Sequence, residues 1–312
     1  MPSIDRPTVA LTGASGFLGR HLVTSLTASG WRVRAISRSG RIEGGDVEVI
    51  SGSLDDGPAL DALVGDVDAI VHAAGLVKAL TAAEFTRVNV EGTARLLRCA
   101  QKRAPGAHVV LVSSLAAREP QLSPYAASKR EAEERAKRLV GDACLTIVRP
   151  PALYGPYDTA SLSVFQSVRL PLTPLLARGD ERIAMLHVAD AADMIADLVA
   201  PRRTGLFSLA DERPGGYSMR DIFTEAGRAV GSRPRFVRIP RSLFLSAGYG
   251  ALLVSRLRNR ATILSPGKVR EMLHKDWSVA RDEMPPRTRG KVRTLEGGFS
   301  ETVAWYRAAG WL

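Results

Sequence analysis

The stretch VALTGASGFLG, residues 9–19, begins with a short apolar run typical of a buried strand and continues through three glycines into a helical pattern. Gly13 permits a tight turn, Gly16 lets backbone N–H groups approach a pyrophosphate, and Gly19 lets the helix pack closely on the strand. The N-terminus of the following helix favours negative charge. The stretch therefore predicts a dinucleotide-binding loop at the start of a parallel sheet.

Outward from this loop, apolar runs alternate with amphipathic segments up to about residue 150. We expect strands at 9–11, 33–36, 69–72, 109–112 and 145–148, and helices at 17–29, 82–103 and 124–139. This alternation predicts an α/β fold with a doubly wound, parallel, Rossmann-like sheet that spans residues 1–150 as a dinucleotide-binding domain. Beyond Arg149, prolines interrupt the rhythm, and we expect helices at 188–199, 218–230 and 295–309. Residues 151–312 are thus predicted to form mainly a smaller C-terminal substrate-binding lobe, with some segments returning to the sheet.

The end of the second expected strand concerns the choice of cofactor. A site that prefers NAD places an aspartate or glutamate there for the adenosine ribose, whereas this chain has Ser37, Arg38 and Ser39. The planar fork of Arg38 can pair with a 2′-phosphate. We therefore expect NADP(H), with NAD as the alternative if Arg38 is only a solvated surface charge.

Tyr125 and Lys129 are four residues apart at the start of an expected helix, so they lie on one face. A neighbouring ammonium stabilises a phenolate, which predicts a lowered pKa for Tyr125 and suits it to proton transfer. Ser114 ends the preceding strand, where a hydroxyl can bind the same substrate oxygen. These three residues are the candidate catalytic group.

Together these motifs resemble the extended (atypical) short-chain dehydrogenase/reductases, the NAD-dependent epimerase/dehydratase family. The resemblance covers nearly the whole chain, in order: Thr12–Gly19, His72-Ala73-Ala74-Gly75, Asn89, Ser113-Ser114, Tyr125 with Lys129, Arg149–Pro156, residues 186–192 and residues 295–306.

The resemblance implies that Tyr125 is the acid/base, that Lys129 also holds the nicotinamide ribose, and that Ser114 polarises the substrate oxygen. Asn89 is expected to be either structural or functional. The cofactor-binding residues implied are Gly13, Ser15, Gly16, Phe17, Leu18, Gly19, Arg38, Ser53, Leu54, His72, Ala73, Ala74, Gly75, Asn89, Tyr125, Lys129, Pro150, Ala152 and Leu153. We expect no metal site.

Two positions depart from the family pattern. Ser53 stands where many members have an aspartate that contacts the adenine, and Pro151-Ala152 replaces an asparagine that helps sugar-nucleotide enzymes hold a diphosphate. The chain therefore looks closer to the reductase and hydroxysteroid dehydrogenase branch. We expect an oxidoreductase that transfers hydride between NADP(H) and a ketone or secondary alcohol of a small, moderately apolar substrate. The alternatives are a nucleotide-sugar epimerase or dehydratase with tightly bound NAD, and a non-catalytic dinucleotide-binding sensor or assembly protein.

Composition sets the remaining expectations. The net charge of the 312 residues is +11, but the arginines are spread along the chain, which disfavours a nucleic-acid partner. Cys99 and Cys144 are the only cysteines, and residues 1–8 lack the pattern of a secretory signal, so we expect a cytoplasmic protein. The resemblance makes a homodimer reasonable.

The longest apolar stretch, residues 242–257, is too short and too interrupted to span a bilayer. It leads into the basic residues Arg256, Arg258 and Arg260. We expect a flap over an apolar substrate, with weak peripheral membrane contact as the alternative.

Overall fold

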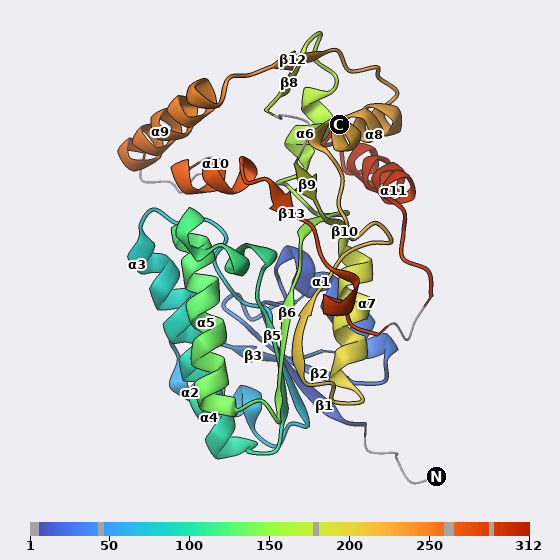
Figure 1. The fold of residues 1–312 in the computed structure, drawn as a ribbon. Coiled ribbons are helices and arrows are strands. Elements are labelled where there is room, and N and C mark those ends of the chain that lie inside the picture. The colour runs from blue at the N-terminus through green and yellow to red at the C-terminus, as the bar shows by residue number, and fades with distance from the viewer. Residues whose placement is uncertain (1–5, 43–46, 177–180, 259–264, 287–289) are drawn as a thin grey trace.

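A parallel sheet of seven strands forms the centre of the computed structural model, which describes residues 6–42, 47–176, 181–258, 265–286 and 290–312 (Figure 1). The strand order is β11-β6-β5-β4-β1-β2-β3, and every neighbouring pair is parallel. The strands are β1 (Thr8–Thr12), β2 (Arg32–Ser37), β3 (Val47–Ser51), β4 (Ala69–His72), β5 (His108–Val112), β6 (Leu145–Arg149) and β11 (Gly205–Ser208). Chain order reverses between β1 and β4, and a ligand crevice is expected outside the carboxyl ends at such a point.

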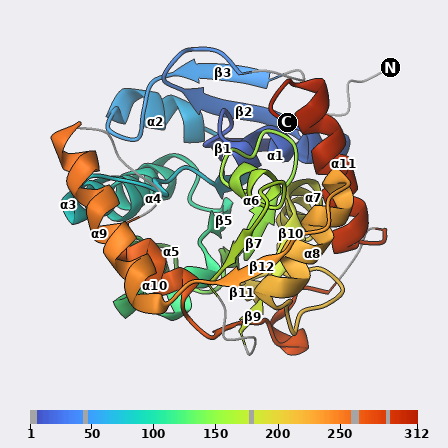
Figure 2. The same cartoon turned by 90° about the horizontal axis from the view of Figure 1, so that it is seen from above.

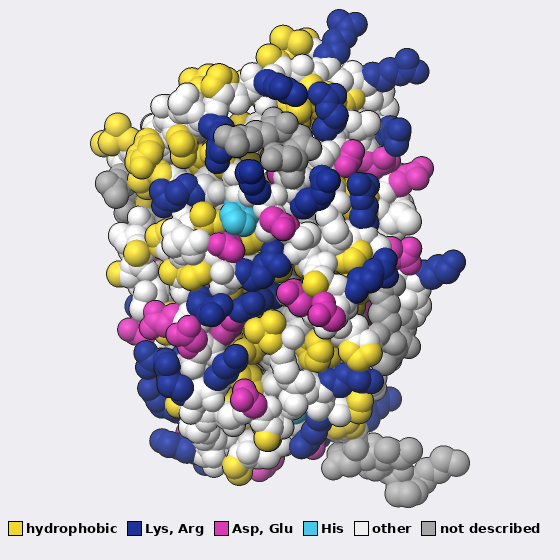
Figure 3. Space-filling model, in the orientation of Figure 1, with side chains coloured by type: hydrophobic (Ala, Val, Ile, Leu, Met, Phe, Trp, Pro, Cys, Tyr) yellow, Lys and Arg dark blue, Asp and Glu magenta, His cyan; other side chains and the backbone are white. Residues whose placement is uncertain are grey.

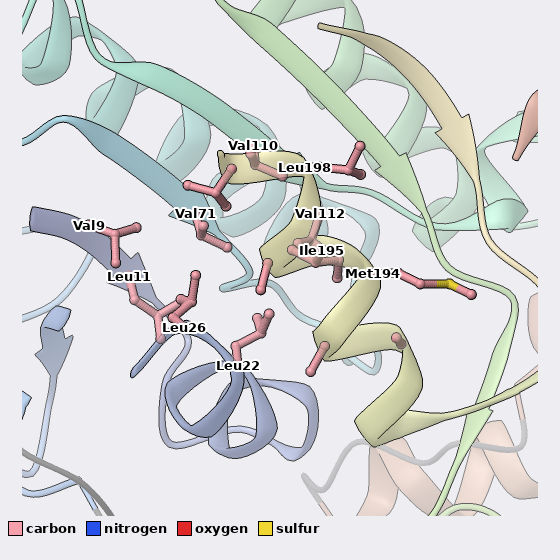
Figure 4. Close-up of a cluster of buried hydrophobic side chains, with 14 of the residues drawn as sticks. Val9, Leu11, Leu22, Leu26, Val71, Val110, Val112, Met194, Ile195 and Leu198 are labelled. Atoms are coloured by element: carbon pink, nitrogen blue, oxygen red, sulfur yellow. The ribbon is translucent and has the colours of Figure 1, made fainter. Parts of the chain in front are cut away.

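Helices cover both faces of this sheet. One face carries α2 (Gly57–Val64), α4 (Gly92–Arg103) and α5 (Pro124–Val140), and the other carries α1 (Phe17–Ala28) and α7 (Val188–Val199). Figure 4 shows the second layer, where Leu22 and Leu26 of α1 and Ile195 and Leu198 of α7 meet strand residues such as Val71. The doubly wound α/β fold is therefore confirmed.

The helix expected over residues 82–103 is divided into three parts. A short α3 (Ala82–Phe85) passes into a π-helical segment (Thr86–Glu91) and then into α4. One π-helical turn changes the direction of the following side chains and is frequent at functional sites. Here it carries the buried Asn89. The expected strand list also lacked β3, and no helix was expected at α2.

The C-terminal half adds a smaller set of elements above the carboxyl ends of the strands (Figures 1 and 2). Three parallel strand pairs lie there: β7 (Ala152–Tyr154) with β10 (Met185–His187), β8 (Thr173–Leu175) with β12 (Phe236–Arg238), and β9 (Arg182–Ile183) with β13 (Asp276–Trp277). The helices are α6 (Leu162–Ser167), α8 (Met219–Val230), α9 (Arg241–Leu257), α10 (Pro266–Met272) and α11 (Leu295–Ala308), and short 3₁₀ turns occur at Leu115–Arg118, Pro120–Leu122 and Arg281–Glu283. Tyr154, Phe165, Phe299 and Tyr306 form a separate core for this half. β11 and α7 return from it to the main sheet and its helix layer.

Candidate active site

The glycine loop joins β1 to α1 at the reversal of strand order. Gly13 has a φ of +78°, and a Cβ there would lie 2.7 Å from the Ala74 backbone nitrogen. A Cβ on Gly19 would lie 1.9 Å from the Gly13 carbonyl oxygen. These two positions therefore accept only glycine, because the loop presses against both the β4 turn and its own helix.

The mouth of this loop is open to solvent. Ser15 and Gly16 are exposed, and Gly16 begins α1 without a side-chain cap and without an acidic residue in the first turn. Phe17 and Leu18 are half-buried, and Leu18 packs against the core below. An uncapped helix N-terminus lined by glycine offers backbone N–H donors to an anion.

The ends of β2 and β3 border the loop. The Ser37 hydroxyl donates to the Arg41 carbonyl (3.0 Å) in a turn in which Arg38 is exposed. Ser53 is half-buried and its hydroxyl accepts the Asp55 backbone N–H (3.2 Å), while the Leu54 carbonyl is bound by Arg95 (2.8 Å). The exposed Arg38 guanidinium is thus the first charged group after the end of β2.

His72 lies below the surface of the site, in a chain of hydrogen bonds. Thr93 donates its hydrogen to the Asn89 carbonyl (2.6 Å), so its oxygen accepts from His72 Nε2–H (2.8 Å). Thr12 accepts the Ala74 backbone N–H and therefore donates to His72 Nδ1 (2.6 Å). Burial, with help from the Lys129 charge, lowers the pKa of His72 to about 3, so the ring is neutral and links β1, β4 and α4. In the turn that follows His72, Ala73 and Ala74 are half-buried and Gly75 is exposed.

Asn89 clamps the turn after β4 to α5. Its Oδ1 accepts the Leu76 N–H (2.7 Å), and its Nδ2 donates to the Leu76 carbonyl (3.1 Å) and to Ser128 Oγ (2.9 Å). Both amide donors are therefore used inside the protein. A Cβ on Gly75 would lie 3.1 Å from Asn89 Oδ1, so this turn has little spare room.

Ser114, Tyr125 and Lys129 come together where β5 ends and α5 begins. The Ser114 side chain lies close enough to the Tyr125 phenol to lower its pKa, and its hydroxyl accepts the Ala116 N–H (3.2 Å). Lys129 is 8% exposed, and its Nζ donates to the carbonyl of Val112, the last residue of β5 (2.7 Å). The structure thus brings the three predicted catalytic residues to one place.

The direction of the tyrosine pKa shift differs from the sequence-based prediction. Burial raises the pKa of Tyr125 to about 12; the Ser114 hydrogen bond opposes this and the charge of Glu271 adds to it. Burial lowers the pKa of Lys129 to about 8 against the attraction of Glu133. The prediction of a lowered tyrosine pKa is therefore wrong for this structure, because burial of the phenol has the largest effect on it. Tyr125 is protonated at neutral pH.

A buried ion pair that the motif search missed holds α5 against the sheet. Arg149, the last residue of β6, donates two hydrogen bonds to Glu133 of α5, from Nε (2.9 Å) and from Nη2 (2.6 Å). The Ser113 hydroxyl donates to the same carboxylate (2.5 Å). Glu133 is one turn beyond Lys129, so this network fixes the height of the catalytic helix above the strand ends. A glutamate one turn after Lys129, on the same buried face of the helix, is the signal that could have revealed it.

A second missed carboxylate reaches the site from the C-terminal half. Glu271 of α10 is 5% exposed and accepts hydrogen bonds from Ser123 Oγ and from Lys268 Nζ (3.0 Å). Ser123 caps α5, two residues before Tyr125. A Cβ on Gly267 would lie 2.8 Å from Ser123 Cβ, so α10 presses directly on the catalytic turn. No sequence pattern pairs residues 148 positions apart.

The remaining predicted residues follow β6. The Pro150 carbonyl accepts the Leu115 N–H (2.9 Å), which ties this segment to the residue after Ser114. Ala152 is exposed and Leu153 is half-buried at the start of the upper half. They therefore lie along the same edge as the catalytic group.

Comparison with known proteins adds independent findings. A family model described as the NAD dependent epimerase/dehydratase family matches residues 9–205. The chain is 44% identical to a ceramide reductase of Caulobacter vibrioides (strain NA1000 / CB15N), over 100% of this chain and 98% of that protein. It is 30% identical to a 4-hydroxy-2-methyl-3-oxo-4-farnesyl-3,4-dihydroquinoline-1-oxide ketoreductase of Stigmatella aurantiaca, over 66% of this chain and 65% of that protein. The solved structure of MoeE5 in complex with UDP-glucuronic acid and NAD has the same fold, with a TM-score of 0.71 and 22% identity over 97% of this chain and 99% of that one.

Proposed function

Because the chain belongs to the NAD-dependent epimerase/dehydratase family and is an NAD(P)-dependent oxidoreductase, we propose that it uses NADPH to reduce a ketone on a long-chain, ceramide-like lipid. Family membership confirms the resemblance predicted from the motifs. The observation that carries the proposal is that Ser114, a protonated Tyr125 and the buried Lys129 meet where β5 ends and α5 begins.

Each catalytic side chain has a role that its environment supports. Reduction of a ketone needs a proton donor at the carbonyl oxygen, and a tyrosine with a pKa of about 12 holds that proton at neutral pH. Ser114 donates a second hydrogen bond to the same oxygen. Lys129 has three N–H donors, of which the Val112 carbonyl takes one, so its charge can stabilise the phenolate that remains after transfer.

The loop residues fit a dinucleotide with a 2′-phosphate. The glycines leave a cradle that side chains would fill, and the N-terminus of α1 has no competing cap. Arg38 is exposed just after β2, the strand that pairs with β1. We assign the pyrophosphate to residues 13–19 and the 2′-phosphate to Arg38. A bound nicotinamide supplies the hydride, while the protein orients and protonates the substrate.

The proposed class of substrate is inferred from the names of two relatives. The ceramide reductase matches this chain end to end, and the Stigmatella aurantiaca ketoreductase acts on a compound whose name includes a farnesyl group. Both names describe molecules with long apolar chains. An amide carbonyl resists hydride, so the group reduced on a ceramide-like lipid is a ketone of its long-chain base.

Turnover assays test the proposal. We expect NADPH oxidation that matches formation of a secondary alcohol, measured by mass spectrometry, when a long-chain keto-amide is supplied in mixed detergent micelles. Tyr125→Phe serves as the inactive control. Conversion of UDP-glucose without net change in nicotinamide would instead support an epimerase, and NADPH binding without turnover of any carbonyl compound would support a non-catalytic sensor.

A further inference from the structure

Between positions 242 and 253, the exposed face of α9 carries apolar and small polar residues and no charged one. Its large exposed side chains are Leu243 (58%), Tyr249 (59%), Leu253 (61%) and Leu257 (78%). The other exposed residues between positions 242 and 250 of the helix are Ser242, Ser246, Ala247 and Gly250. A helix on the surface of a water-soluble domain usually turns charged residues outward, whereas this stretch of α9 exposes leucines and a tyrosine.

The buried residues of α9 lie on its opposite face. Gly248 and Ser255 are buried, and a Cβ on Gly248 would lie 2.8 Å from Val269 of α10. Phe244 and Leu252 are half-buried beside it. The exposed leucines are on the other side of the helix from Gly248, and α9 itself lies at the outer edge of the molecule (Figure 1). Figure 3 shows hydrophobic side chains gathered at the upper left, over this helix.

The segment of the chain that contains α9 is rich in positive charge. Residues 232–275 contain ten basic residues and a single acidic one, Glu271, which is buried against Ser123. The exposed basic residues of the described part of this segment are Arg233, Arg235, Arg238, Arg241, Arg258, Arg270 and Lys275, whereas Arg260 lies outside the described residues. An apolar strip with an exposed arginine at each end of its helix, Arg241 and Arg258, is complementary to an anionic lipid surface.

We propose that α9 docks this protein on the surface of an anionic phospholipid bilayer, with Leu243, Leu253 and Leu257 inserted among the headgroups. None of the helices that the structure describes meets the length and hydropathy needed to cross a membrane, so the contact is interfacial. The same helix rests on α10, and α10 contacts the turn that carries Tyr125. Docking would therefore hold the catalytic turn near the lipid phase. This last step rests on the proposed lipid substrate, whereas docking itself is measured without turnover.

Flotation of the full-length, NADPH-loaded protein with lipid vesicles tests the inference. We expect binding to vesicles of phosphatidylcholine with about one third phosphatidylglycerol, and much weaker binding to phosphatidylcholine alone. The variant Leu243→Gln/Leu253→Gln/Leu257→Gln should lower the partition coefficient at least ~10-fold. It should keep the wild-type Tm and the wild-type affinity for NADPH, because the three side chains are exposed and their replacement removes no core packing.

A second pair of variants separates docking from net charge. Arg238→Gln/Arg241→Gln/Arg258→Gln should lose binding to the anionic vesicles. Arg98→Gln/Lys102→Gln/Lys137→Gln removes equal charge from exposed positions of α4 and α5 and should bind as wild type. Equal loss in both triple variants, no flotation of the wild type, or wild-type binding of the leucine variant would overturn the proposal. So would light scattering that shows a wild-type dimer and a monomeric leucine variant, since a second copy would then cover the face.

Discussion

Replacing Glu133 by glutamine should loosen the catalytic helix without touching any residue assigned to substrate. The Glu133 carboxylate accepts two hydrogen bonds from Arg149 and one from Ser113, and the side chains of the ion pair are only 3% and 10% exposed. Glutamine keeps the size of the side chain but places an amide donor against the guanidinium. The arginine charge is then left buried without its partner.

The burial of the Glu133–Arg149 ion pair sets the size of the expected loss of stability. Removal of one member of a buried ion pair typically costs ~3–5 kcal/mol. Arg149 keeps some access to water, so we expect the lower end, about 3 kcal/mol. At ~2–4 °C per kcal/mol for a domain of this size, Tm should fall by about 6–12 °C. The loss of the Glu133 charge should also move the pKa of Lys129 below its value of about 8, because that charge is what opposes the burial effect.

Two measurements check these expectations. Calorimetry gives Tm, and the pH dependence of kcat/KM gives the alkaline limb, which should shift to lower pH. Glu134→Gln is the matched control, because Glu134 lies next on the same helix, is exposed, and pairs with Arg130 on the surface (3.2 Å). A surface pair of this kind contributes ~0.5 kcal/mol or less.

The reasoning fails if both variants have the same Tm and the same alkaline limb. A large drop in Tm with an unchanged pH profile would keep the structural role of Glu133 and remove its influence on Lys129. Recovery of Tm in Glu133→Gln/Arg149→Met would support the pair as the cause, because no buried charge then lacks a partner.

Four further changes test the site. Tyr125→Phe should bind NADPH almost normally and lose ~10²–10⁴-fold in kcat, and full turnover would remove Tyr125 as the proton donor. Arg38→Ala should abolish a preference for NADPH over NADH of at least ~10-fold in titration calorimetry, whereas equal affinities in the wild type would make Arg38 a mere surface charge. Gly16→Val should remove dinucleotide binding but keep the circular dichroism spectrum, since its Cβ meets only the Gly13 carbonyl oxygen, at 3.1 Å. The wild-type kcat/KM should decline above about pH 8 as Lys129 loses its proton, and Lys129→Met should lack this limb.

Local sequence determined the parts of this protein whose spacing carries its own geometry. Glycines three residues apart between a strand and a helix define the loop, because Gly13 and Gly19 occupy positions where a Cβ would collide with backbone. Four-residue spacing put Tyr125 and Lys129 on one helix face, and strand-end position put Ser114 beside them. The family and the fold class followed from the order of these motifs.

The tertiary structure alone decided what surrounds them. Glu271 reaches the catalytic turn from 148 residues beyond Ser123, and Arg149 meets Glu133 only because β6 ends beside α5. These contacts join segments whose sequences carry no shared period. The protonation of Tyr125 also depends on tertiary packing, because burial and neighbouring charges determine a pKa. The spacing of Tyr125 and Lys129 alone predicted a lowered tyrosine pKa, whereas burial in the folded protein raises it.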